Sequence, residues 1–353
     1  LIKAGHTIRI EQGAGESAGF PDKTYSDAGA SVVHLSELFA GVDLVVRVAR
    51  PSERELDAMP VGTTLVGILA PLGDPRYVEM LAAHKLRALS MDTIPRITRA
   101  QSMDVLSSQS NIAGYKAVIL AAEYLPKFFP MLTTAAGTIA PAKVLILGAG
   151  VAGLQAIATA RRLGAVVSGY DVRAVVKEQV QSLGATFLEF DLGADAEGSG
   201  GYAKELTPEQ AERQRQWMAD HIGNSDVVIP TALVPGRRAP ILITEEAVRK
   251  MRPGSVIVDV AADAGGNCAL TTPGEVKIED GVTIVGTKNL PATLPLHASQ
   301  LYSRNVLAFL EVIVKDGKLN LDRGDEIVRD TLLTSDGEIL HEPTKAALAG
   351  GRA

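Results

Sequence analysis

The chain has 353 residues, of which 46% are apolar, and this size and composition suit two domains with buried cores. The formal net charge is −6 with acids and bases interspersed, and the lack of any Lys/Arg block argues against binding to nucleic acid or to an anionic membrane surface. The single cysteine, Cys268, excludes an internal disulfide framework and favours a reducing compartment.

The first hundred residues alternate short apolar runs with segments of helical period. We predict strands within 6–15, 44–49, 63–69 and 86–92, and helices or turns within 25–33, 55–59 and 75–84. This alternation is typical of βαβ units built on a mostly parallel sheet. The opening residues, which begin at Leu1 rather than Met, resemble the end of a helix running into a strand. We therefore expect a strand and part of a helix to precede them.

A polar segment, PRITRAQSMDVLSSQSN (95–111), follows the first series of elements. We predict one long helix from Arg99 to Tyr124. At about 100° per residue, an arc of about 120° on this helix would hold Gln101, Asp104, Ser107, Ser108 and Asn111. From the residues alone, the arc is either a solvated face at a domain boundary or a polar binding surface.

A second α/β series begins at Lys143, with strands predicted within 143–148, 166–171, 186–190, 226–233, 255–261 and 282–289. Another long helix is predicted from about Pro295 to Val314, followed by a weak strand within 325–334 and an unpatterned end from Thr344. The two series predict an α/β fold with two doubly wound, Rossmann-like lobes joined by long helices. We expect the first lobe to comprise residues 1–110 with 297–353, and the second to comprise residues 111–296.

The run VLILGAGVAG (144–153) combines a strand pattern with three glycines in G-x-G-x-x-G spacing and the start of a helix. Gly148 would permit the tight turn, Gly150 would let the backbone approach a pyrophosphate, and Gly153 would let helix and strand pack closely. The N–H groups at the start of the helix, at Val151 and Ala152, would face the phosphates. The glycines and the two arginines that follow the run argue against a membrane-spanning helix.

Asp171 ends the next predicted strand, 18 residues after Gly153. A carboxylate there can accept hydrogen bonds from both ribose hydroxyls and would repel a 2′-phosphate, which favours NAD(H) over NADP(H). Arg173 complicates this preference, because a nearby arginine can accommodate a phosphate. The bland alternative is a glycine-rich turn beside a solvated acid. No metal site is expected, since the histidines are scattered and Cys268 lacks partners at ligand spacing.

Several separated segments resemble one family. They are PRITRAQSMDVLSSQSNIAGYKAV, VLILGAGVAGLQAIATARRLGAVVSGYDVR, KEQVQSLGA, GGYAKE, TALVPGRRAPILIT, GSVIVDVAADAGGNC and NLPATLPLHASQLY. Together they resemble domain I of the proton-translocating nicotinamide nucleotide transhydrogenases, the NAD(H)-binding component within the alanine dehydrogenase/transhydrogenase superfamily. The resemblance extends from Leu1 to about Ile339.

The resemblance implies hydride transfer between NAD(H) on this chain and NADP(H) on a separate domain III, which belongs to a beta subunit. A membrane domain II would couple the transfer to proton translocation. The chain would form a homodimer and act peripherally at the cytoplasmic face of the inner membrane, or on the matrix side in a mitochondrion. No nucleic acid partner is expected.

The resemblance also assigns site residues. Arg96, Gln101, Asp104 and Ser107 would orient the nicotinamide ring and its carboxamide, and Gln101 would also reach toward the second nucleotide. The Gly- and Asp-rich segment 191–203 would be a mobile loop whose Gly201 and Tyr202 close over the bound nucleotide. Further NAD(H) contacts are expected at Val151, Gln214 and Leu233, and Val172 stands between Asp171 and Arg173 in the same motif.

Two alternatives stay open. Alanine dehydrogenase shares the fold, and Asp263 matches an acid that this family uses in catalysis. However, the segment 63–75 lacks the histidine that the family supplies from its first lobe, and the sequence around His84 and Lys85 does not match. The other alternative is an NAD-binding module without chemistry of its own.

Overall fold

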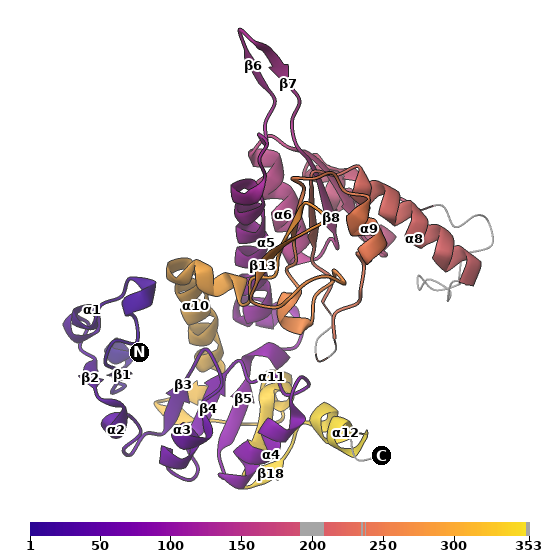
Figure 1. Cartoon of the computed structure of the whole chain (residues 1–353). Coiled ribbons are helices and arrows are strands. Elements are labelled where there is room, and N and C mark those ends of the chain that lie inside the picture. Colours follow the sequence, from indigo (N-terminus) through magenta and orange to yellow (C-terminus); the bar gives the residue numbers. More distant parts are fainter. Residues whose placement is uncertain (191–207, 234–235, 237, 351–353) are drawn as a thin grey trace. The chain divides into compact units, whose positions relative to one another are not determined.

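The computed structural model describes residues 1–190, 208–233, 236 and 238–350 (Figure 1). The chain divides into two compact units. The first unit comprises Leu1–Gln109 and Leu294–Ala353, and the second comprises Ser110–Thr293. Both units contain parallel strands flanked by helices, so the predicted α/β fold is confirmed.

The main sheet of the first unit has the strand order β18-β17-β5-β4-β3. Its parallel part consists of β3 (Leu44–Val46), β4 (Thr64–Gly67) and β5 (Arg87–Ser90). Antiparallel pairing adds β17 (Leu332–Ser335) and β18 (Glu338–Ile339). A separate parallel pair consists of β1 (Arg9–Glu11) and β2 (Ser31–Val33). The 25–33 segment is therefore a helix followed by a strand, because Ser31–Val33 pairs with β1.

Alternate residues of β4 and β5 face opposite sides of this sheet, as the pleat requires. Val66 and Leu89 pack in a buried cluster with Phe309. Leu65 and Ala88 pack in another cluster, with Leu56 and Leu81 among its members. The helices involved are α10 (Pro295–Ile313) and α11 (Glu326–Thr331) on one face, and α3 (Glu53–Ala58) and α4 (Pro75–Ala83) on the other. Smaller elements of this unit are α1 (Asp22–Asp27), α2 (Leu35–Leu38), β15 (Val314–Lys315) and β16 (Lys318–Leu319).

The sheet of the second unit has the strand order β10-β9-β8-β11-β12-β14-β13. The parallel strands are β8 (Lys143–Leu147), β9 (Val166–Tyr170), β10 (Thr186–Phe187), β11 (Val227–Pro230), β12 (Val256–Val258) and β14 (Val282–Val285). The edge strand β13 (Val276–Glu279) is antiparallel to β14. The chain order reverses between β8 and β11, and such a switch point is where doubly wound folds bind ligands.

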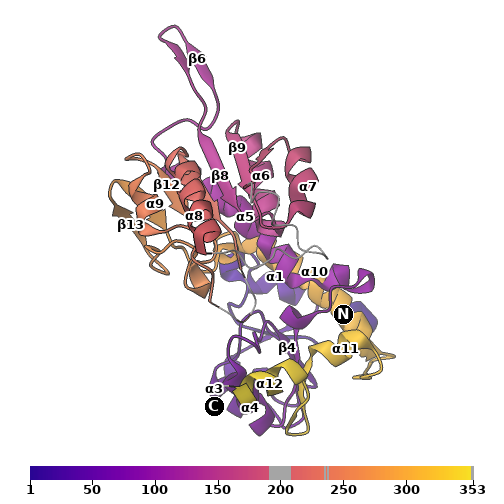
Figure 2. The ribbon, with the colours of Figure 1, turned by 90° about the vertical axis from the view of Figure 1, so that its right-hand side faces the viewer.

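Strand β8 shows how the second unit builds two cores. Val144 and Ile146 pack with α6 (Val151–Arg162) and α7 (Lys177–Ser182), whereas Leu145 and Leu147 pack with α8 (Pro208–Gly223) and α9 (Glu245–Arg249). Figure 2 shows these two pairs of helices on opposite sides of β8. A hairpin of β6 (Leu132–Thr134) and β7 (Gly137–Ile139) extends away from the rest of the unit (Figure 1).

The predicted continuous helix from Arg99 to Tyr124 is wrong at its start. Thr98–Met103 forms a 3₁₀ helix, η4, and Asp104 is extended, with φ −72° and ψ 91°. The α-helix α5 runs from Val105 to Tyr124. The interruption arises because the Asp104 carboxylate accepts a hydrogen bond from the Ser107 amide at 2.8 Å, as an N-cap side chain does. Gln101 therefore does not share a helical arc with Asp104 and Ser107.

The predicted strand and unpatterned end of the tail are also wrong in part. Residues 326–331 form α11 because Asp325 caps the helix at Ile327 and because Ile327, Val328 and Thr331 turn a helical face into the core. Residues 342–350 form α12. Among the described residues, no helix combines the length and the apolar character needed to cross a bilayer.

Candidate functional site

The glycine loop after β8 adopts the conformation that its spacing predicts. Gly148 has φ +100°, and a Cβ there would lie 2.6 Å from Thr231 Oγ1. A Cβ on Gly153 would lie 1.8 Å from the Gly148 carbonyl oxygen. Both positions therefore require glycine, Gly148 for the turn and Gly153 for the contact between helix and loop.

Gly150 differs from the other two glycines. It is the N-cap of α6, and a Cβ built on it would meet no atom of the described residues within 4 Å. The space above Gly150 is thus open, next to the N–H groups of Val151 and Ala152 at the first turn of α6. A helix start with an open glycine before it fits an anionic group such as a pyrophosphate.

Asp171 is tied to the same loop. Its Oδ2 accepts hydrogen bonds from the Ala149 amide at 2.7 Å and from an Arg173 guanidinium nitrogen at 2.9 Å. Its Oδ1 accepts from the Arg173 amide and Nε, both at 2.9 Å. Burial raises the pKa of Asp171, but the hydrogen bonds from Arg173 and Ala149 outweigh it, and the pKa lies below its ordinary value. The Asp171 side chain is 7% exposed, so this is not a solvated acid.

Next to Asp171, the expected contact residues lie around Tyr170 at the end of β9. Gln214 of α8 donates its Nε2 hydrogen to the Tyr170 hydroxyl at 2.8 Å. The Tyr170 ring meets Trp217 edge-on, with 5.5 Å between the ring centroids. Val172 is exposed beside this cluster, as a residue that contacts a ligand can be. Sequence reasoning did not single out Tyr170.

The segment after β11 carries Leu233, which is exposed. The Thr231 hydroxyl bonds to the carbonyl oxygens of Leu147 and Gly148, at 3.2 and 3.1 Å. Ala232 is held by Asn267, whose Oδ1 accepts from the Ala232 amide at 3.0 Å and whose Nδ2 donates to the Ala232 carbonyl at 2.9 Å. The chain beside Leu233 is thus fixed to the glycine loop on one side and to Asn267 on the other.

Asn267 is itself fixed by Asp259, which ends up fully buried just after β12. Asp259 Oδ2 accepts hydrogen bonds from the amides of Asn267 and Cys268 at 2.8 and 2.9 Å, and from the Thr271 hydroxyl at 2.6 Å. Thr231, Asp259 and Asn267 were missed by sequence reasoning. The partners of Asn267 lie 27 and 35 residues away, so no local pattern could have revealed them.

The polar segment 96–107 lies at the junction of η4 and α5. Arg96 and Gln101 are exposed, and neither side chain forms a hydrogen bond to a described residue. In contrast, the Asp104 carboxylate is engaged by both the amide and the hydroxyl of Ser107, at 2.8 and 2.6 Å. The segment therefore presents two unengaged polar groups beside one capped helix start.

Two of the expected site residues, Gly201 and Tyr202, lie outside the described residues. The described portion of the chain also contains no group of three or more His, Cys, Asp or Glu side chains arranged to hold a metal ion.

Comparisons with known proteins identify the family. Residues 1–113 match the N-terminal domain, and residues 117–342 the C-terminal domain, of the family described as alanine dehydrogenase/PNT. The chain therefore belongs to this family. Members of the family bind NAD(H), which confirms the expected cofactor at the level of the family.

Within the family, the chain is more similar to transhydrogenases than to alanine dehydrogenases. It is 47% identical to the first of the split NAD(P) transhydrogenase alpha subunit chains of Rhodospirillum rubrum, covering 97% of this chain and 91% of that protein. A solved transhydrogenase structure from Sinorhizobium meliloti is 42% identical, with a TM-score of 0.84 over 97% of this chain and 92% of that one. A solved L-alanine dehydrogenase is 28% identical, with a TM-score of 0.81 over 99% and 92%.

Proposed function

We propose that this chain is the NAD(H)-binding component of a proton-translocating transhydrogenase. Hydride passes between NAD(H) held here and NADP(H) held by domain III of a partner beta subunit, and a membrane domain II couples the transfer to proton translocation. The observation that carries the proposal is the 47% identity, over nearly the whole chain, to a transhydrogenase alpha subunit.

The second unit supplies the groups that suit a dinucleotide. The open backbone at Gly150 and the start of α6 suit the pyrophosphate, and Asp171 suits the ribose. Both Asp171 oxygens already accept hydrogen bonds. Ribose hydroxyls would therefore replace the Arg173 guanidinium there. This exchange keeps the carboxylate hydrogen-bonded in both states.

The first unit supplies groups that suit the nicotinamide. Arg96 and Gln101 have donors and acceptors available for a carboxamide and for a second nucleotide, and Asp104 with Ser107 forms the adjoining polar pair. Hydride transfer between two nicotinamides releases no proton at the reacting carbons, so no general acid or base is required. The protein contributes by holding the rings at reacting distance and excluding water.

The proposal is tested by mixing the chain with a purified, NADP(H)-loaded transhydrogenase domain III. We expect the chain alone to bind NADH without any reaction, and the mixture to transfer hydride from NADH to an oxidised NAD analogue through the bound NADP(H). If NADH binds but the mixture transfers nothing, the chain is only a binding module.

The alternative activity is alanine oxidation, which needs an acid–base group near the nicotinamide. Asp263, the residue that matches the alanine dehydrogenase acid, is exposed and accepts the Asn289 amide at 2.7 Å. We expect no turnover of L-alanine with NAD. Clear turnover would replace the proposed function with that of an amino-acid dehydrogenase.

Gln101→Asn tests the role of the polar segment. Shortening the side chain by one methylene should slow transfer by roughly 10- to 100-fold while leaving the NADH dissociation constant nearly unchanged, because Gln101 acts on ring placement. An equal loss of rate and affinity would instead assign Gln101 to binding of the ground state.

We also propose that the chain is a homodimer that works peripherally at the cytoplasmic face of the inner membrane, or on the matrix side in a mitochondrion. Phe128, Met131 and Ile139, in and before the β6–β7 hairpin, are large apolar side chains exposed in one chain. Light scattering should give the mass of two chains, and Met131→Asp should shift the protein toward one chain. A monomeric wild type would refute the dimer without affecting the hydride-transfer proposal.

A further inference from the structure

The 3₁₀ helix η4 has three faces, because it has about three residues per turn and residues i and i+3 eclipse. One face consists of Ala100 and Met103, which are both buried. They pack in a core cluster that includes Tyr302 and Val306 of α10. In addition, Asn305 of α10 donates its Nδ2 hydrogen to the Ser102 carbonyl at 2.7 Å. This face of η4 is therefore fixed against α10.

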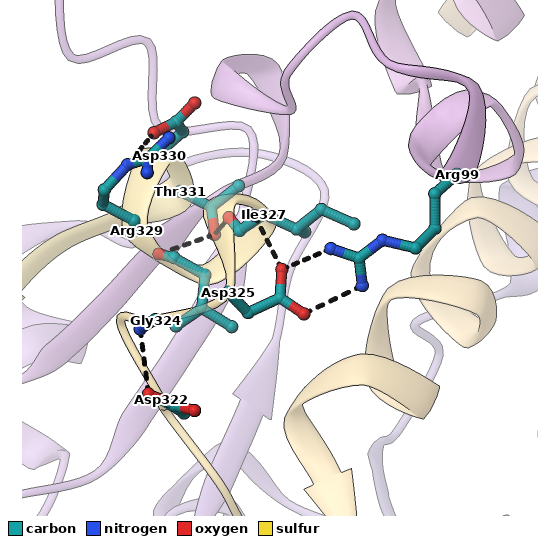
Figure 3. A network of polar contacts seen from close by, with 9 residues as sticks. Arg99, Asp322, Gly324, Asp325, Ile327, Arg329, Asp330 and Thr331 are labelled. Atoms are coloured by element: carbon teal, nitrogen blue, oxygen red, sulfur yellow. Dashed lines mark hydrogen bonds and ion pairs between the residues drawn. The ribbon is translucent and has the colours of Figure 1, made fainter.

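A second face carries Arg99, which is fastened to a different element. Its guanidinium donates two hydrogen bonds to the Asp325 carboxylate, at 2.8 and 2.6 Å (Figure 3). The two residues are 226 positions apart in the sequence. Such a bidentate pair defines the plane of both groups, which a single contact does not.

The carboxylate of this pair is held in place before it meets Arg99. Asp325 is the N-cap of α11, and its Oδ1 also accepts the Ile327 amide at 2.9 Å (Figure 3). Ile327 and Val328 of the same helix are buried in the core of the first unit. The hydrogen bonds from Arg99 hold the pKa of Asp325 below its ordinary value, so the pair stays ionised at neutral pH.

The third face of η4 consists of Thr98 and Gln101, and both are exposed. Two faces are thus fastened, and the remaining one presents the residue to which we assign ring placement. The Arg99 and Asp325 side chains are 52% and 26% exposed, and ion pairs at such positions add little to stability. Their effect is instead to fix the rotation of η4 about its axis.

We propose that Arg99 is a positioning residue for hydride transfer, acting through Asp325 to hold the Gln101 side chain toward the nicotinamide. This inference rests on the proposed function. It assigns to the chain a rate-determining contact that touches no nucleotide.

The test uses the full chain mixed with NADP(H)-loaded domain III. Arg99→Gln removes the charge and the fork, and Asp325→Asn removes the charge while keeping a good N-cap. Each should slow transfer at saturating NADH by roughly 10-fold, because a small misplacement of reacting groups is costly in rate. The NADH dissociation constant should stay within about 2-fold, and the unfolding temperature within about 3 °C, because the pair is exposed.

Three further variants sharpen the test. The double variant R99Q/D325N should be about as slow as either single variant, because both changes remove one shared contact. Arg99→Lys should recover part of the rate, because it keeps the charge but not the bidentate geometry. The matched control is Arg329→Gln, which breaks an exposed ion pair with Asp330 on the same helix (Figure 3) and should leave the rate unchanged.

The outcomes separate the two proposals. If the wild type transfers hydride and Arg99→Gln keeps its rate, the positioning role is wrong and the proposed function stands. If the two single effects multiply in the double variant, or if affinity and unfolding temperature fall along with the rate, the pair is not a specific positioning contact. If the wild type transfers no hydride, the proposed function fails and the positioning role fails with it.

Discussion

Asn267 should be one of the most sensitive positions in the second unit. Its side chain makes three hydrogen bonds to the main chain: from the Ala232 amide at 3.0 Å, to the Ala232 carbonyl at 2.9 Å and to the Pro240 carbonyl at 2.7 Å. Asn267 is fully buried. Replacement by Ala therefore strands three polar groups away from water, where each lost hydrogen bond costs about 1 kcal/mol. We expect Asn267→Ala to lower the free energy of unfolding by about 3 kcal/mol.

The single tryptophan of the chain makes this measurable for one unit. Trp217 packs against Tyr170 in the second unit, so its fluorescence should follow the unfolding of that unit in urea. With a slope of about 2 kcal/mol/M, the expected loss lowers the urea midpoint by about 1.5 M. NADH affinity, measured where both proteins are folded, should fall as well, because Ala232 adjoins the expected contact residue Leu233.

Two controls decide whether the hydrogen bonds carry the effect. Asn224→Ala removes one exposed hydrogen bond, to the Asp220 carbonyl, and should change stability by less than about 0.5 kcal/mol. Asn267→Asp keeps the size and the acceptor but turns an oxygen toward two carbonyls, so it should destabilise at least as much as Ala. A midpoint shift for Asn267→Ala no larger than that for Asn224→Ala would refute the reasoning.

Three other changes have defined outcomes. Gly153→Ala should prevent stable folding, because the added Cβ meets the Gly148 carbonyl, whereas Gly150→Ala should fold normally but bind NADH more weakly; circular dichroism and an NADH titration separate the two. Asp171→Ala should weaken NADH binding and relax the discrimination against NADPH, and unchanged discrimination would argue against its ribose role. Burial lowers the pKa of His341 below 6.5, so the unfolded chain takes up the proton first, and stability present above about pH 6.5 is lost as the pH falls. Denaturation of the wild type and of His341→Asn between pH 7 and 5 should show this loss only in the wild type.

The second unit was largely predictable because its central strands are buried on both faces. Such strands appear in the sequence as continuous apolar runs, of which 144–147 and 256–258 are examples. The edge strand β13 was missed because its side chains alternate between exposed and partly buried positions. The β6–β7 hairpin was missed because it is short, polar and mostly exposed, and therefore leaves no apolar pattern.

The start of α5 was mispredicted because periodicity does not detect a local competitor of the helix. The Asp104 side chain bonds to the Ser107 amide, which ends the 3₁₀ segment and begins a new helix. An Asp followed three residues later by a Ser is compatible with either outcome. The burial of Ala100 and Met103 against α10, which is distant in the sequence, decides between them.

The candidate site divides in the same way. The glycine loop and Asp171 were predictable because their conformations and contacts are set within about thirty residues of chain, and the geometry at Gly148 and Gly153 leaves no room for a side chain. The support for these residues was not predictable. Asn267 and the Arg99–Asp325 pair act across 35 and 226 residues, and neither belongs to a local pattern.

This division has a consequence for the reaction. The proposed pyrophosphate and ribose contacts lie in the second unit and are built from short stretches of chain, whereas the proposed nicotinamide segment lies in the first unit and is held by distant partners. Binding energy from the remote part of a substrate fixes affinity, and orientation at the reacting end fixes rate. Variants of the second unit should therefore act mainly on NADH affinity, and variants around η4 mainly on transfer at saturation. Rate-specific effects spread evenly over both units would mean that ring placement depends on the whole chain and not on one fastened segment.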